Sequence, residues 1–220
     1  MNNTAAIENI REALRQHADE KTKQSAQHFF KESVRFYGVK STDIHKISKT
    51  HFKQIANPAK EEIFALCEML WQSGFMEESI VACNWSYQMR KHYQPEDFYI
   101  FEKWINQYVT NWAACDTFCN HTVGTLIEMY PPLLQHLKTW TLSPNRWMRR
   151  AAAVSLIVPA KKGKFLKDIF EIANQLLHDN DDMVQKGYGW MLKVSGQCHE
   201  KEVFDFVMYH KKTMPRTALS

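Results

Sequence analysis

The stretch EEIFALCEMLWQ, residues 61–72, places apolar side chains at intervals of three and four residues. This spacing gathers them on one face of an α-helix, whereas a strand would need strict alternation. The same period recurs in ESIVACNWSYQM (78–89), FLKDIFEIANQLL (165–177) and EVFDFVMYH (202–210). Strand-like alternation is missing, and seven glycines in 220 residues argue against a turn-rich β fold. The sequence therefore predicts an all-α chain.

Proline and glycine divide this helical chain into short elements. Three polar-proline pairs predict helix starts with proline at the first helical position, namely Asn57-Pro58, Gln94-Pro95 and Ser143-Pro144. Breaks are predicted at Gly38, Ser73-Gly74, Pro131-Pro132, Pro159 to Gly163 and Ser195-Gly196.

The prolines also suggest a repeat. Pro58, Pro95 and Pro132 are spaced by 37 residues, which is about the length of one helix pair in a helical solenoid. We therefore expect residues 1–220 to form one domain, an α–α superhelix of HEAT-like repeats with a concave face for an extended partner. A compact helical bundle is the alternative. At MPRTALS a last helix only begins, so we expect the C-terminal helix to be incomplete.

Positive charge is concentrated in the C-terminal part. From Lys138 onward there are 14 Lys and Arg against 8 Asp and Glu, a balance of +6, within a chain of formal net charge +4. The five cysteines include no CxxC pair and follow no signal peptide, which indicates a reducing, cytoplasmic setting. Cys115, Cys119 and His121 supply too few well-placed ligands for a metal, so we expect none. No apolar run is long enough to span a bilayer.

One charged residue stands out in NWAACDTFCNH, residues 111–121. Asp116 follows Trp112 by four positions, which places the carboxylate and the indole one turn apart on one helix face. An aspartate on a helix surface beside a core tryptophan is the structural alternative to a functional pair.

Two further stretches combine basic and apolar residues. In DMVQKGYGWMLKVSG (182–196), Lys186 and Lys193 share a helical stripe with Trp190, which a core would not tolerate. A tryptophan at the domain edge, covered by lysine stems, is the alternative. In SPNRWMRRAAAVSLIVP (143–159), three arginines occupy the first two helical turns, where they oppose the helix dipole; they are Arg146, Arg149 and Arg150. We interpret these arginines as ligands of an external anion such as a phosphate backbone.

Together, WAACD (112–116), RWMRRAA (146–152) and QKGYGWMLK (185–193) resemble the AlkD-like family of DNA alkylation repair glycosylases, and FFKESVRFYGV (29–39) does so more loosely. The resemblance implies a HEAT-like superhelix whose concave basic face holds duplex DNA. It implies that Asp116 is catalytic, that Trp112 and Trp190 contact the lesion nucleotide, and that Arg150 holds the DNA backbone. Phe29 stands where the best-known members have a tyrosine that contacts DNA.

The resemblance implies that the chain is a DNA glycosylase of base excision repair. We expect it to hydrolyse the N-glycosidic bond of cationic N3- or N7-alkylated purines in duplex DNA, without base flipping. Arg146, Arg149, Lys186 and Lys193 are the expected additional contacts to the DNA backbone. We expect a monomer that uses no metal or nucleotide cofactor, binds no membrane and associates with the nucleoid when bound to DNA.

Two other functions remain open at this stage. The same scaffold could bind DNA structures without excision, although the WAACD motif favours an enzyme. It could also be a protein-interaction scaffold with its aromatic residues as peptide anchors, although the arginine cluster favours nucleic acid.

Overall fold

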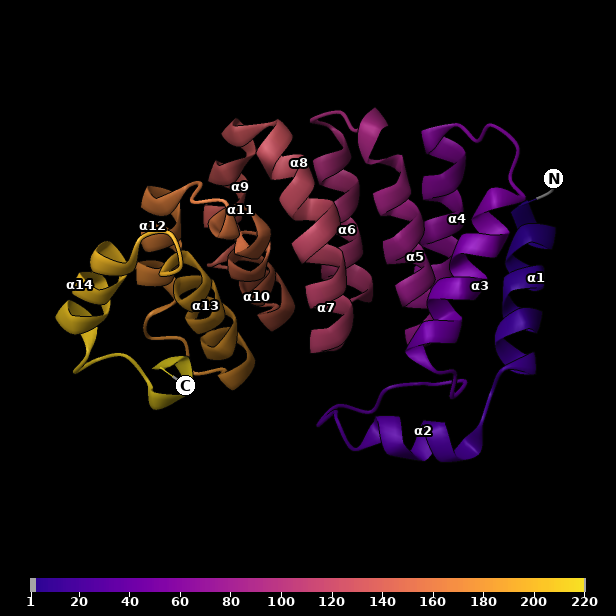
Figure 1. Cartoon of the computed structure of the whole chain (residues 1–220), viewed down its shortest axis with the longest axis horizontal. Coiled ribbons are helices and arrows are strands. Elements are labelled where there is room, and N and C mark those ends of the chain that lie inside the picture. The colour runs from indigo at the N-terminus through magenta and orange to yellow at the C-terminus, as the bar shows by residue number, and fades with distance from the viewer. Residues whose placement is uncertain (1–2, 220) are drawn as a thin grey trace. The chain divides into compact units, whose positions relative to one another are not determined.

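The computed structural model describes residues 3–219, which form helices joined by short connections (Figure 1). Within these residues no strand forms beyond an isolated bridge between Arg35 and Phe75. Within each unit some successive helices pack against each other in pairs, such as α4 (Lys60–Gln72) with α5 (Met76–Gln88) and α12 (Leu166–Leu176) with α13 (Asp182–Ser195), as in an α–α superhelical repeat. The structure confirms the prediction of an all-α fold of this type, while the concave basic face stays a prediction.

The helices group into two compact units, which meet in sequence between Tyr93 and Gln94. The prediction of a single domain over residues 1–220 therefore stays a prediction. Unit 1 contains α1 (Asn3–Gln16), α2 (Glu20–Gln27), α3 (Ser41–Lys53), α4 (Lys60–Gln72), α5 (Met76–Gln88) and a 3-10 turn η1 (Met89–His92).

The core of unit 1 follows the periodicity of its sequence. In α4, six apolar residues are buried: Ile63, Phe64, Leu66, Cys67, Leu70 and Trp71. They pack α4 against α1 and α5, and α3 in turn packs against α1 and α5. Helix α2 runs crosswise to these four in Figure 1. Burial of apolar surface therefore stabilises the helices that the period of three and four residues predicted.

Two adjacent carboxylates fix the long segment between α2 and α3. Glu77 accepts hydrogen bonds from the backbone N–H groups of Gly38 (2.8 Å) and Val39 (3.1 Å). Glu78 accepts one from the Tyr37 hydroxyl at 2.7 Å and further ones from Arg11. Both glutamates are fully enclosed in unit 1, and these bonds offset the cost of burying their charges.

Unit 2 is built around one helix. Its elements are α6 (Asp97–Tyr108), α7 (Trp112–Phe118), a π-helical turn η2 (Cys119–Val123), α8 (Gly124–Met129), η3 (Pro131–Leu133), α9 (Leu134–Trp140), α10 (Arg146–Val154), α11 (Ile157–Lys161), α12 (Leu166–Leu176), α13 (Asp182–Ser195), α14 (Glu200–His210) and η4 (Arg216–Leu219). Helix α10 contacts α6, α7, α9, α12 and α13. Its three consecutive alanines, Ala151 to Ala153, are completely buried, and their small side chains allow these close contacts.

Two glycines of α13 permit close approach on two sides. A Cβ at Gly187 would lie 3.3 Å from the Arg150 Cγ, so the glycine lets α13 lie directly against the stem of that arginine. A Cβ at Gly189 would overlap the carbonyl oxygen of Ala218, so this glycine lets η4 pack on α13. The last helix that the sequence predicted to begin at the C-terminus corresponds to η4, a single 3-10 turn over the described residues.

The sequence placed the starts of three helices two residues too early. Helices α4, α6 and α10 each begin two residues after the proline that was expected to be their first helical residue, namely Pro58, Pro95 and Pro144. The predicted breaks hold at Gly74 and Gly163, whose φ angles of 70° and 71° lie in the left-handed region.

Candidate functional site

Helix α7 begins at one of the predicted site residues. The Asn111 side chain caps it by accepting a hydrogen bond from the Ala114 N–H at 2.9 Å. Trp112 is the first helical residue and is half-buried, and Asp116 lies one turn later. The other face of α7 is buried in unit 2 through Cys115 and Phe118. The predicted pairing of an indole and a carboxylate along one helix face is therefore present.

Asp116 forms a two-pronged ion pair with Arg150 of α10. The Arg150 Nε donates to Asp116 Oδ1 and Nη2 donates to Oδ2, both at 2.8 Å. The two side chains are only 15% and 6% exposed, so the pair is largely shielded from water. Arg150 Nη1 also donates to the backbone carbonyl of Met183. The guanidinium therefore joins α7, α10 and the first turn of α13.

Burial and the ion pair with Arg150 shift the pKa of the Asp116 carboxyl group in opposite directions. Burial raises the pKa of Asp116, and the hydrogen bonds and charge of Arg150 reduce that rise without cancelling it. For Arg150, burial lowers the pKa, but the bonds and charge of Asp116 outweigh it and the pKa is raised. Arg150 thus stays charged, and Asp116 is held next to that positive charge in a poorly hydrated environment.

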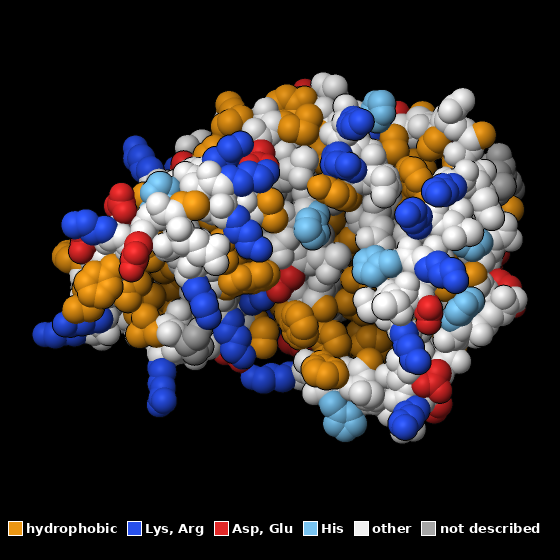
Figure 2. Space-filling model, in the orientation of Figure 1, with side chains coloured by type: hydrophobic (Ala, Val, Ile, Leu, Met, Phe, Trp, Pro, Cys, Tyr) orange, Lys and Arg blue, Asp and Glu red, His pale blue; other side chains and the backbone are white. Residues whose placement is uncertain are grey.

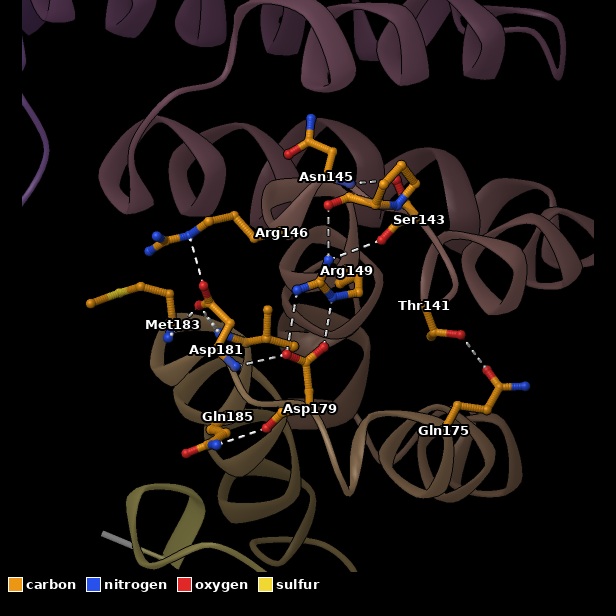
Figure 3. Close-up of polar contacts among 12 residues, drawn as sticks. Thr141, Ser143, Asn145, Arg146, Arg149, Gln175, Asp179, Asp181, Met183 and Gln185 are labelled. Atoms are coloured by element: carbon orange, nitrogen blue, oxygen red, sulfur yellow. Dashed lines mark hydrogen bonds and ion pairs between the residues drawn. The ribbon is translucent and has the colours of Figure 1, made fainter.

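The other two arginines of α10 pair with carboxylates just before α13 (Figure 3). Arg149 Nε lies 2.6 Å from Asp179 Oδ2, and Arg146 Nε lies 3.1 Å from Asp181 Oδ2. Asp181 also caps α13 by accepting from the Met183 N–H at 2.9 Å. The arginines of α10 therefore fix the start of the helix that carries Trp190.

These contacts change the interpretation of the arginine cluster. The sequence suggested that three arginines at a helix start require an external anion, but the protein supplies a carboxylate to each of them. Arg149 additionally donates to the backbone carbonyls of Ser143 and Pro144, at 2.9 and 3.1 Å. Contacts of Arg146, Arg149 and Arg150 with a DNA backbone stay predictions. The partners that were missed have a sequence signal, because HDNDD, residues 178–182, is an acidic run of matching charge.

The basic stripe of α13 lies at the surface. Trp190 is half-buried, and Lys186 and Lys193 are exposed on either side of it. These residues line a hollow of about 200 Å³ whose other wall comes from η4; its residues are Lys186, Gly189, Trp190, Lys193, Thr217 and Ala218. Lys186 Nζ lies 3.6 Å from the Asp182 carboxylate, an ion pair along the same helix. The hollow is open to solvent.

Phe29 belongs to unit 1 and follows the end of α2. Its side chain is 71% exposed, which is unusual for a large apolar residue in this protein. An exposed aromatic ring can stack on a base or pack on a sugar, so its predicted contact with DNA stays a prediction.

The described residues give no indication of a bound metal. Over residues 3–219 no group of three or more His, Cys, Asp or Glu side chains is arranged to hold a metal ion. Cys115 and Cys119 are buried, and His121 points to the exposed side of η2. All five cysteines are free thiols. None of the described helices combines the length and apolarity that crossing a membrane requires.

Comparison with known proteins shows which family and which fold the chain is similar to. The sequence profile of a family described as DNA alkylation repair enzyme matches residues 10–220. A solved structure described as a predicted DNA alkylation repair enzyme from Enterococcus faecalis is similar in fold, with a TM-score of 0.81 at 17% sequence identity. The similarity covers 92% of this chain and 93% of that one. No curated protein matches the sequence.

Proposed function

Because the chain belongs to the family of DNA alkylation repair enzymes, we propose that it is a DNA glycosylase that releases cationic N3- or N7-alkylated purines from duplex DNA. The observation that carries this proposal is the poorly hydrated carboxyl group of Asp116, fixed by the two-pronged contact with Arg150. The carboxylate lies one turn from Trp112, which supplies an aromatic face on the same side of α7.

The chemistry of the substrate explains why one carboxylate would suffice. An alkylated cationic purine is already a good leaving group, so breaking its glycosidic bond needs no general acid. The sugar gains oxocarbenium character as the bond breaks, as in glycoside hydrolysis. A preorganised carboxylate stabilises that positive charge and can orient the attacking water. A neutral purine would remain uncleaved at such a site, which gives selectivity for the lesion.

The ion pair with Arg150 leaves hydrogen-bond acceptor positions of Asp116 available for the substrate. An ionised carboxylate offers about four acceptor positions. Arg150 uses one on each oxygen, which leaves the others for a water molecule and for the sugar. We infer that Arg150 acts first as a positioning residue, which keeps Asp116 ionised and in one orientation. A contact of the same guanidinium with the DNA backbone is the additional role that the family resemblance implies.

Other residues would hold the DNA around this centre. We propose that Trp190 and Trp112 face the lesion nucleotide, where aromatic faces attract a cationic sugar and exclude water. Lys186 and Lys193 would contact phosphates on either side of Trp190, and Arg146 would add a further contact at the rim. Phe29 of unit 1 would pack on the duplex. In this scheme the base stays stacked, and the protein acts as a monomer without a cofactor.

An excision assay tests the proposal directly. The full chain is incubated with duplex DNA that contains an N7-alkylated guanine, and the released base is quantified over time against undamaged duplex. Release that exceeds the spontaneous rate and disappears in the Asp116→Asn variant supports the glycosylase. Absence of release by the folded parent protein would refute it.

One observation favours a second candidate, a DNA-binding protein without excision activity. The Asp116–Arg150 pair is a buried ion pair that could serve folding alone. Such a protein would retain alkylated duplex in a binding assay and release no base. A protein-interaction scaffold would neither retain the duplex nor cleave it.

A further inference from the structure

Helix α2 of unit 1 has little packing surface of its own. None of its eight residues, all of which the structure describes, is buried, and only Thr22 and Ala26 are half-buried. The helix contacts that build the core of unit 1 join α1, α3, α4 and α5. Figure 2 shows mainly polar and charged side chains where α2 lies in Figure 1. The position of α2 therefore depends on what holds its two ends.

The start of α2 is held by a residue that follows the helix in sequence. The Asp19 N–H donates to the Gly38 carbonyl at 2.9 Å. Gly38 has a φ angle of 97°, in the region that favours glycine. A Cβ at this position would lie 2.4 Å from the Asp19 carbonyl oxygen and 2.8 Å from the Lys23 Cβ. Only glycine therefore allows the start of α2 to lie so close to this segment.

The end of α2 is attached to the same segment. The Gln27 side-chain amide donates to the Glu32 carbonyl at 3.1 Å. The rings of Phe30 and the buried Phe36 lie 5.6 Å apart. Phe29, the exposed residue that is expected to contact DNA, directly precedes Phe30. The position of Phe29 thus depends on where Phe36 is held.

One carboxylate of α5 determines the backbone of this segment, residues 34–39. Glu77 accepts hydrogen bonds from three successive N–H groups, those of Tyr37 at 3.1 Å, Gly38 at 2.8 Å and Val39 at 3.1 Å. Residues 34–39 belong to no helix, so their buried N–H groups need an acceptor from elsewhere. The Glu77 carboxylate is that acceptor, and it is itself only 1% exposed.

Neighbours of Glu77 hold the side chain of Tyr37. The Tyr37 hydroxyl donates to Glu78 at 2.7 Å, and its ring stacks on Phe75 with centroids 4.2 Å apart. Arg11 donates to Glu78 at 3.2 Å. Apolar residues in place of a buried ion pair are often neutral for stability. The two buried glutamates are therefore better explained by the single conformation that they impose on residues 34–39.

We propose that Glu77 is a positioning residue for DNA binding, which fixes α2 and Phe29 in one orientation on unit 1 by holding residues 34–39. Glu77 is enclosed and touches no DNA itself. A loosely held α2 would have to be ordered when the duplex binds, which costs affinity. Loss of Glu77 should therefore weaken binding and leave the chemistry at Asp116 unchanged. The proposal rests on the proposed function for the contact of Phe29 with duplex DNA.

A double-mutant cycle on undamaged duplex tests this role. Phe29→Ala should weaken binding by roughly five-fold or more, as expected for a lost aromatic contact with DNA. Glu77→Gln keeps the shape but turns an NH₂ group toward the backbone N–H groups, so it should weaken binding to no more than the same extent. The double variant Phe29→Ala/Glu77→Gln should bind within about two-fold of Phe29→Ala, because Glu77 then has no contact left to position. The excision rate of Glu77→Gln at saturating protein should equal that of the parent.

Tryptic cleavage reports whether α2 has come loose. Exposed lysines lie in and just after this helix, at Lys21, Lys23 and Lys31. Well below the melting midpoint, Glu77→Gln should be cut at these lysines faster than the parent, because local opening is easier. Ile63→Val is the control, since it shortens a fully buried side chain of α4 and lowers global stability. It should leave both the cleavage at these lysines and the duplex affinity unchanged.

A second variant reaches the same segment without altering a buried charge. Gly38→Ala places a Cβ against the Asp19 carbonyl and displaces the start of α2. It should reproduce the loss of affinity and the non-additivity with Phe29→Ala. This variant decides the question if Glu77→Gln does not fold.

The outcomes separate this proposal from the glycosylase proposal. Parent affinity in the folded Glu77→Gln variant would refute the positioning role, and so would a loss that multiplies with that of Phe29→Ala. Parent affinity in Phe29→Ala would also refute it, because Glu77 would then position nothing that binds DNA. If the parent releases no alkylated base but the cycle is non-additive, the positioning role stands and the glycosylase proposal fails. If base is released and the cycle is additive, the reverse holds. A parent protein that does not bind duplex would refute both.

Discussion

Replacement of Asp116 by asparagine separates the structural role of this residue from its chemical role. The substitution keeps the shape and one acceptor oxygen but removes the charge that faces Arg150. Breaking a buried ion pair by neutralising one partner typically costs about 3–5 kcal/mol. The pair here is 15% and 6% exposed, and Arg150 keeps its bond to the Met183 carbonyl, so we expect the lower end, about 3 kcal/mol. For a chain of this size that lowers the melting midpoint by roughly 6–12 °C.

The excision rate of Asp116→Asn should fall for a reason that is separate from the loss of stability. Loss of one preorganised electrostatic partner of the transition state costs about 10²- to 10³-fold. Excision is measured in single turnover on N7-alkylguanine duplex, well below both melting midpoints, and divided by the folded fraction. We expect a drop of at least that size, with affinity for the lesion duplex within a few-fold of the parent.

The double variant Asp116→Asn/Arg150→Gln supplies the control. It removes both charges, so it should regain part of the stability that Asp116→Asn loses, because no unpaired guanidinium remains buried. Excision should stay low, since the carboxylate is still missing. A normal rate per folded Asp116→Asn molecule would show that Asp116 is purely structural. An unchanged melting midpoint would show that the ion pair does not contribute to folding.

Three further predictions follow from the same site. The excision rate should fall on acidification at a pH above the ordinary carboxyl range, because burial raises the pKa of Asp116 and the ionised form is the active one; a flat profile down to about pH 4 would contradict this. Trp112→Ala and Trp190→Ala should reduce excision with less loss of stability than Trp104→Ala, a fully buried control for which about 3–5 kcal/mol is expected; melting curves with the opposite order would place the two tryptophans in the core. If Arg150 contacts a phosphate, Arg150→Gln should lower the salt slope of duplex binding by about 0.9, whereas a residue that only positions Asp116 should leave the slope unchanged.

The sequence predicted the helices well because their signal is local. A period of three and four residues identified the buried face of α4, and each such residue can be recognised from neighbours within two turns. The helix starts were misplaced by two residues for an equally local reason. At α10, the Asn145 side chain caps the helix by accepting the Trp147 N–H at 2.9 Å, so Ser143-Pro144 lies outside it. Capping geometry, and not proline alone, determines where the helix begins.

The partners of the arginines could not be predicted in the same way. Arg150 meets Asp116 across 34 positions of sequence, and Arg149 meets Asp179 across 30. The paired side chains come together only when α10 packs against α7 and α13. The stem of Arg150 fits between these helices because Gly187 has no side chain. The sequence singled out Asp116 and the three arginines, but it assigned the arginines to an external anion. Their nearest anions lie in the protein itself.

The ion pairs of the three arginines change which residues contribute most to the positive electrostatic potential of the protein. Arg146, Arg149 and Arg150 each face a carboxylate, so the cluster at α10 is largely neutralised and attracts a polyanion less than its three charges suggest. Lysines without such partners, among them Lys46 and Lys49 of α3 and Lys193 of α13, are then the stronger source of long-range attraction for a polyanion. The arginines instead use their geometry, since a planar fork can hold a carboxylate in one orientation where an ammonium group cannot. The unpaired lysines thus supply charge that can attract DNA from a distance, whereas the arginines of α10 supply charge that orients carboxylates within the protein. We expect substitution of the lysines to weaken DNA binding. Substitution of the α10 arginines should instead affect turnover and folding.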